Sequence, residues 1–268
     1  GAASSGGTGH NNIAIGCNTL KNNLTTACYN ISMGAGAGQC ISSGNYNLMF
    51  GMHSGDKITT GFGNIVMGTN AGCAISDGDY NVSLGWNAGR GDVTNPATNT
   101  STDSIAIGRC AGLMLTSGCD NTFVGTLAGK SVTTVKRSVA IGFNAAASIT
   151  GGDGQFVAMG PSAMGSATNA AACAVAIGAF AGQNFQHSTA VAVGPYAGNA
   201  NTSGQNNTFI GSNAGRNVST TSGVTAIGKD ALYSTSTGTQ NTALGSAAGY
   251  CASTGCRNTF LGSSAGYY

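Results

Sequence analysis

A short apolar segment ending in glycine recurs fifteen times along the 268 residues. The spacing between these glycines is nearly constant, apart from one interval that is six residues longer than the usual one. The repeat glycines are Gly16, Gly34, Gly51, Gly68, Gly85, Gly108, Gly125, Gly142, Gly160, Gly178, Gly194, Gly211, Gly228, Gly245 and Gly262. The repeat unit is about 17 residues long, and a regular period of this length predicts a solenoid, in which each repeat forms one coil and stacks on its neighbours.

The three residues before each glycine predict one short β-strand per coil. The first and third are mostly large and apolar, as in Ile13 and Ile15, whereas the middle residue varies from alanine to phenylalanine. Alternation with a period of two over so few residues is typical of a strand. We expect parallel strands across residues 13–262, with the large residue before each glycine buried in every coil.

The remaining positions of the repeat predict a narrow coil with sharp corners. Alanine stands three residues after the glycine in thirteen of fifteen repeats. If the strand forms one wall of the coil, such small residues let a second wall lie close to it. Eight to ten residues after the glycine comes a turn such as residues 42–44, where glycine is expected to supply a positive φ. Asparagine precedes the strand in nine repeats, which predicts an asparagine ladder from coil to coil.

The predicted fold class is therefore an all-β parallel β-solenoid of about fifteen coils. We expect residues 1–12 to form an N-terminal half-coil arm and residues 13–268 a single repeat domain. The long interval adds six residues, including Pro96, and predicts a surface insertion at 91–104.

Composition argues against several classes of protein. Charged residues make up 7% of the chain, glutamate is absent and the formal net charge is +2, so we expect no nucleic-acid partner. Strong helix formers are too scarce for a helical domain. The sequence has no run of eighteen apolar residues, so we expect no membrane insertion.

Four strings in the repeats resemble a known family. They are residues 11–16 (NNIAIG), 138–142 (SVAIG), 241–249 (NTALGSAAG) and 258–266 (NTFLGSSAG). These strings are similar to the head repeats of YadA-like trimeric autotransporter adhesins and to related repeats of phage tail fibres, although the head repeats are shorter than the repeat unit of this chain. The resemblance implies a left-handed parallel β-roll, a homotrimer, a location outside the cell or on a virion surface, and a role in attachment.

Nine cysteines, none of them in a CxxC motif, favour disulfides and therefore an extracellular protein. Cys251 and Cys256 flank one turn and are the first predicted pair. Cys28 and Cys40 lie in adjacent coils and are the second. The alternative is that isolated cysteines serve as small buried hydrophobic residues.

Residues that could carry chemistry are scattered. The three histidines lie in separate coils, and no nucleophile has a plausible base, so we expect no enzyme activity, metal or cofactor. Arg90, Gly91 and Asp92 form an integrin-type tripeptide that could act in surface recognition. Tyr233, Tyr250 and Tyr267 share one repeat position and could form a sugar-binding or inter-chain strip, or a packing ladder.

The sequence ends in the first part of a repeat and begins in the second part of one, so the two ends together make one whole repeat. This predicts that subunits join end to end. We therefore expect a structural extracellular fibre subunit that assembles into a filament. The alternative is an adhesin head or phage tail-fibre shaft that binds a glycan or protein on a host surface. The residues predicted at the assembly junction are Gly7, Thr8, Gly9, Asn12, Gly266, Tyr267 and Tyr268.

Overall fold

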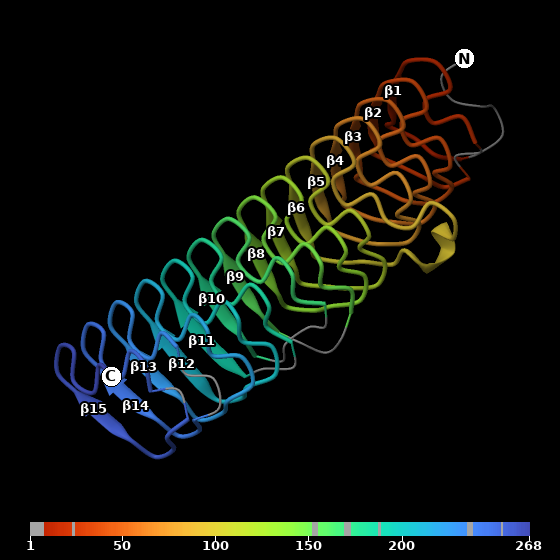
Figure 1. Cartoon of the computed structure of the whole chain (residues 1–268). Coiled ribbons are helices and arrows are strands. Elements are labelled where there is room, and N and C mark those ends of the chain that lie inside the picture. Colours follow the sequence, from red (N-terminus) through yellow and green to blue (C-terminus); the bar gives the residue numbers. More distant parts are fainter. Residues whose placement is uncertain are drawn as a thin grey trace. The chain divides into compact units, whose positions relative to one another are not determined.

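The computed structural model confirms an all-β parallel β-solenoid with one strand per coil (Figure 1). The chain forms two compact units, unit 1 (Gly1–Arg137) and unit 2 (Ser138–Tyr268), where the sequence predicted a single repeat domain. The repeat spacing does not mark this division, because Gly125 and Gly142 are separated by one ordinary repeat. The structure describes residues 8–22, 25–151, 155–168, 173–186, 189–234, 238–252 and 254–268.

Successive strands pair in parallel within each unit, and the register advances by one repeat at every step. Leu48 lies opposite Ile65, for example, and Ile65 lies opposite Val82. Unit 1 contains β1 (Ile13–Ile15), β2 (Ile31–Met33), β3 (Leu48–Phe50), β4 (Ile65–Met67), β5 (Val82–Leu84), β6 (Ile105–Ile107) and β7 (Thr122–Val124). Unit 2 contains β8 (Val139–Ile141), β9 (Val157–Met159), β10 (Val175–Ile177), β11 (Ala190–Val193), β12 (Asn207–Ile210), β13 (Thr225–Ile227), β14 (Thr242–Leu244) and β15 (Thr259–Leu261).

The strands face the opposite way from the sequence prediction. The middle residue points into the coil, whereas Ile15 is 54% exposed and Ile177 is 38% exposed. The prediction that the residue before each glycine is buried is therefore wrong. The buried middle residues are Ser32, Met49, Val66, Ser83, Ala106, Phe123, Ala140, Ala158, Ala176, Ala192, Phe209, Ala226 and Ala243.

The narrow interior explains this orientation. The alanine column predicted as the second wall is buried, from Ala37 and Ala71 in unit 1 to Ala248 in unit 2. Alanine on both walls lets the coil close, whereas isoleucine or methionine in most middle positions would overfill it. A third buried column completes the core with Ile41, Ile58, Ile75, Leu115, Val132, Ile149, Phe185 and Val218.

Large and small residues alternate between the walls to keep the interior filled. Phe123 is fully buried, and a Cβ at Gly129, the residue after the wall alanine, would lie 2.6 Å from its Cδ1. In the coil of Ala226, the position equivalent to Gly129 holds Leu232, which is fully buried despite a φ of 47°. In these two coils one large side chain, from a different wall in each, fills the interior.

The repeat glycines are required by close approach of successive coils. Gly51 has a φ of 128°, and a Cβ there would lie 2.8 Å from the carbonyl carbon of Gly68. The turn glycines are different, because Gly61 is not among the positive-φ residues and a Cβ there would lie 2.6 Å from the Gly78 oxygen. The expected positive φ falls instead just before the asparagine column, as at Tyr46 (58°).

The asparagine ladder is confirmed in unit 1. The Asn64 side chain donates to Asn47 Oδ1 (3.0 Å) and to the Gly78 carbonyl (2.8 Å). Its own Oδ1 accepts from the backbone N–H (2.9 Å) and the side-chain amide (3.1 Å) of Asn81. Each buried amide thus bonds to the coils before and after it.

Part of the predicted insertion at 91–104 lies outside the coil, whereas Gly91 and Asn99 are buried in it. The outer part carries the 3₁₀ turn η1 (Pro96–Thr98), which projects from the coils of unit 1 (Figure 1, yellow). Asn99 returns the chain to the solenoid, since its carbonyl accepts from the Ser76 N–H (3.1 Å) and its buried amide donates to Ala74 (2.8 Å). The register then resumes with Val82 opposite Ile105.

Candidate interaction surface

The residues that flank the buried middle position form an apolar surface on each unit, which we call the outer sheet face. None of these residues is charged, and Ile65, Met67, Ile105 and Ile107 are 36–41% exposed. In unit 1 the outer sheet face comprises Ile13, Ile15, Ile31, Met33, Leu48, Phe50, Ile65, Met67, Val82, Leu84, Ile105, Ile107, Thr122 and Val124. In unit 2 it comprises Val139, Ile141, Val157, Met159, Val175, Ile177, Val191, Val193, Thr208, Ile210, Thr225, Ile227, Thr242, Leu244, Thr259 and Leu261.

Continuous exposed apolar patches of this kind are rare on soluble monomers and mark interaction sites. The strands of neighbouring coils lie ~4.8 Å apart. One apolar side chain recurs at that spacing in every coil, and a second does so except where threonine takes its place, at Thr122, Thr208, Thr225, Thr242 and Thr259. The sequence contained this surface, but the pattern was interpreted as the core.

The predicted tyrosine column in unit 2 exists and is a stack of rings. Tyr233 and Tyr250 have ring centroids 5.0 Å apart at an interplanar angle of 5°, and Tyr250 and Tyr267 are 4.9 Å apart at 13°. Desolvation raises the pKa of the Tyr250 phenol, and the neighbouring Tyr233 and Tyr267 add to the shift. Both faces of the Tyr250 ring are covered, whereas a sugar that stacks on an aromatic ring needs an open face. The stack therefore favours the packing or inter-chain interpretation over a sugar platform.

Unit 1 carries a second aromatic column that the sequence reasoning missed. Tyr29 and Tyr46 stack at 5.0 Å and 5°, and the column continues through Phe62 to Tyr80. Tyr29, Tyr46 and Tyr80 are 45–56% exposed, and all three have φ between 55° and 59°. The equivalent position has a positive φ in other coils too, as at Asp120 (58°) and Gln240 (59°), so this conformation belongs to the repeat. The available signal was tyrosine directly before the ladder asparagine in three repeats.

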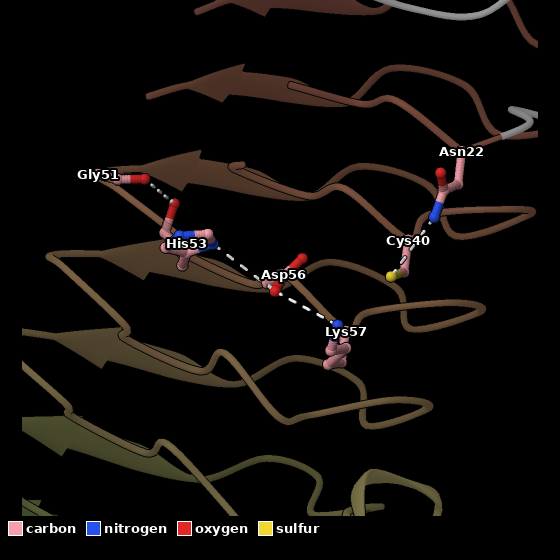
Figure 2. Close-up of polar contacts among 7 residues, drawn as sticks. Asn22, Cys40, Gly51, His53, Asp56 and Lys57 are labelled. Carbon is pink, nitrogen blue, oxygen red and sulfur yellow. Dashed lines mark hydrogen bonds and ion pairs between the residues drawn. The ribbon is translucent and has the colours of Figure 1, made fainter. Parts of the chain in front are cut away.

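Two ion pairs meet at Asp56 in unit 1. His53 Nδ1 lies 3.7 Å and Lys57 Nζ 3.5 Å from Asp56 Oδ2. Dashed lines mark both contacts in Figure 2. Ser54 is buried and donates to the Gly51 carbonyl (3.0 Å), while desolvation raises the pKa of the Cys40 thiol. Neither side chain is an activated nucleophile, so the cluster favours an ion pair at a corner over a catalytic site.

The integrin-type tripeptide is embedded in the coil. Gly91 is buried and donates its N–H to Leu113 (3.1 Å). Asp92 Oδ1 accepts from the backbone N–H (2.8 Å) and hydroxyl (2.6 Å) of Thr94, which lowers the pKa of the carboxyl. Arg90 is only partly exposed. This geometry counts against surface recognition by the tripeptide.

All nine cysteines lie in the described residues and are free, so the predicted pairs Cys251–Cys256 and Cys28–Cys40 are not formed. Three of these four sulfurs contact a group other than the predicted partner. Cys256 Sγ accepts from the Thr239 N–H in the preceding coil (3.4 Å), which lowers the pKa of the thiol. Cys28 Sγ lies 3.2 Å from the Thr26 carbonyl, whereas Cys40 bonds to Asn22 (3.8 Å; Figure 2).

Of the predicted junction residues, Thr8, Asn12 and Tyr267 contact neighbouring coils. Thr8 N–H donates to Thr25 (2.8 Å), and the Asn12 amide donates to Ala27 (2.7 Å). A Cβ at Gly9 would clash with the Ala27 carbonyl, and one at Gly266 would clash with the Phe260 ring. Tyr267 stacks on Tyr250, whereas Tyr268 is fully exposed. Gly7 and His187 lie outside the described residues.

Two further features of the described residues bear on function. No three His, Cys or Asp side chains come together there in a group that could hold a metal ion. That part of the chain also has no helix with the length and hydropathy needed to span a bilayer.

Comparison of the chain with protein-family models, curated proteins and solved structures finds no match. The resemblance to YadA-like head repeats therefore stays a prediction.

Proposed function

We propose that this protein is a non-enzymatic structural subunit of an extracellular fibre and that it assembles with copies of itself. The observation that carries the proposal is the outer sheet face, whose uncharged and mostly apolar side chains are all at least partly exposed. Burying apolar surface stabilises an assembly by about 25 cal/mol per Å². The columns that were expected to form the core of one chain would instead form the core between chains.

A second copy is the partner that fits this surface best. The apolar side chains recur at the spacing of the coils, and an identical chain offers the same spacing along the whole face. Two columns form a narrow strip, and three such strips can meet around one axis. The resemblance to trimeric adhesin heads favours three chains, with end-to-end joining as the second mode of assembly.

The alternative is an adhesin head or phage tail-fibre shaft that binds a host-surface glycan or protein. The aromatic column of unit 1 favours it, because Tyr29, Tyr46 and Tyr80 are 45–56% exposed and tyrosine is enriched where proteins contact their partners. A location outside the cell or on a virion rests on the resemblance, since the structure contains no disulfide to support it.

Sedimentation tests whether the outer sheet face holds chains together. We expect the wild-type protein to sediment as a trimer and the Ile107→Asp variant to sediment as a monomer that keeps its β-sheet circular dichroism. Ile107 is 36% exposed, so the carboxylate remains hydrated in the single chain but is buried unpaired in the assembly. Ser117→Asp is the matched control, because Ser117 is exposed and Asp77 occupies the equivalent position of another coil.

A wild-type protein that stays monomeric at all concentrations, or an Ile107→Asp variant that still forms trimers, would contradict the proposal. Ile107→Thr covers the case in which the aspartate variant does not fold, because Thr122 and Thr225 are already part of this face. We expect this milder variant to weaken the trimer without abolishing it.

A further inference from the structure

We propose that the stacked tyrosine pairs Tyr29–Tyr46, Tyr233–Tyr250 and Tyr250–Tyr267 are sites of oxidative crosslinking, at which dityrosine bonds join consecutive coils of one chain. The inference rests on ring geometry alone and is independent of how the subunits assemble.

The solenoid holds each pair in an unusual arrangement. The rings of each pair come from equivalent positions of consecutive coils, so their side chains leave the backbone in the same direction. Tyr29–Tyr46 and Tyr233–Tyr250 share a centroid distance of 5.0 Å and an interplanar angle of 5°, and Tyr250–Tyr267 is close to both at 4.9 Å and 13°. The ortho carbons of one ring therefore lie beside the same carbons of the next.

These positions suit radical coupling. Loss of one electron and one proton from each phenol gives two tyrosyl radicals with spin density at the ortho carbons. Coupling forms one carbon–carbon bond, and the two ortho hydrogens then move to the phenolic oxygens as the rings become aromatic again. Hydrogen peroxide, acting through a haem peroxidase, takes up the two electrons and two protons and is reduced to two molecules of water.

The rings are accessible and can move. Tyr29 and Tyr46 are 45% and 55% exposed, Tyr267 is 37% exposed, and Tyr233 and Tyr250 are partly exposed. Because they lie on the outside of the coil, rotation about the side-chain bonds can bring the ortho carbons into bonding contact without disturbing the core. Each bond would tie together residues one repeat apart and resist separation of neighbouring coils.

Other aromatic contacts of the chain supply internal controls. Phe180 and Tyr196 stack at 5.0 Å and 11°, but phenylalanine has no phenol to oxidise. Tyr46 and Phe62 are tilted by 59° and lack a second phenol for the same reason. Tyr196 is therefore expected to form no crosslink.

The test treats the full chain with horseradish peroxidase and hydrogen peroxide, then maps peptides by mass spectrometry. We expect linked peptides that have lost two hydrogen atoms, joining Tyr29 to Tyr46 and Tyr250 to Tyr233 or Tyr267. An equal mixture of light and isotope-labelled chains distinguishes bonds within a chain from bonds between chains. A bond within a chain joins two light or two labelled peptides, whereas bonds between chains also join a light peptide to a labelled one. The crosslinked protein should also melt at a higher temperature.

Single phenylalanine variants decide the assignment. Tyr250→Phe should abolish both links in unit 2 and leave the Tyr29–Tyr46 link unchanged. Tyr46→Phe should abolish the Tyr29–Tyr46 link and leave those in unit 2 unchanged. Tyr196→Phe should change none of the links. Tyrosine oxidation without linked peptides, links only between light and labelled chains, or links in unit 2 that persist in Tyr250→Phe would each overturn the proposal.

Discussion

Phe123 and Leu232 fill the same interior space in different coils, from opposite walls. The Phe123 ring packs between Gly112 and Gly129, where a Cβ would lie 3.0 Å and 2.6 Å from ring carbons. Leu232 occupies the position equivalent to Gly129, opposite Ala226, with a φ of 47°. In these two coils the same interior volume is filled by different positions of the repeat.

Exchanging the large residue between walls tests this packing. Phe123→Ala should cost about 3–5 kcal/mol because it leaves a cavity, and Gly129→Leu should cost about 3 kcal/mol because it overfills the coil. The double variant copies the Ala226–Leu232 arrangement, so it should be more stable than the sum of the single effects predicts. Chemical denaturation measures all three free energies of unfolding.

Phe209→Ala combined with Gly129→Leu is the control, because these residues lie in different units and their effects should add. Strict additivity for Phe123→Ala with Gly129→Leu would show that the two side chains do not compete for one space.

The strands illustrate at the scale of elements what the sequence could and could not reveal. The repeat glycines located every strand, and asparagine before the strand predicted the ladder. A period of two identifies two faces but not which one is inside, and here Ala176 and Ile177 are both apolar. The decisive information was volume, since the small middle residues match the alanine wall. The unit 1 aromatic column was missed because Phe62 lies one position earlier in its coil than Tyr46.

The ladder makes a quantitative prediction for one asparagine. Asn64→Ala removes the acceptor of the Asn81 N–H and the donor to Gly78 in a buried site, so it should cost about 3 kcal/mol or more. Asn64→Ser should cost less, because Ser104 stands at the equivalent position and its hydroxyl accepts from the Asn121 N–H (3.3 Å). Thermal denaturation of the two variants measures the difference, and equal losses would show that the side chain contributes only through its volume.

At the scale of the whole molecule, side-by-side and end-to-end association use different parts of the solenoid. The outer sheet face lies along the coils, whereas end-to-end joining would add strands beyond β1 and β15, the first and last in the strand order. Parallel strands present complementary hydrogen-bonding groups at their two edges, so identical subunits can continue the same ladder.

The two modes predict separable effects on filaments in electron micrographs. Wild-type protein at high concentration should form filaments whose mass per unit length corresponds to three chains. The double variant Ile107→Asp with Ile177→Asp should still form filaments, because its coil edges are unchanged, but each should have the mass per unit length of a single chain. Ser117→Asp with Ser203→Asp places the same charges at exposed turn positions and should leave the mass per unit length unchanged. Wild-type particles that remain short and discrete at every concentration would contradict end-to-end joining and favour the adhesin or tail-fibre alternative, since such a subunit presents its surface to a receptor without forming a polymer.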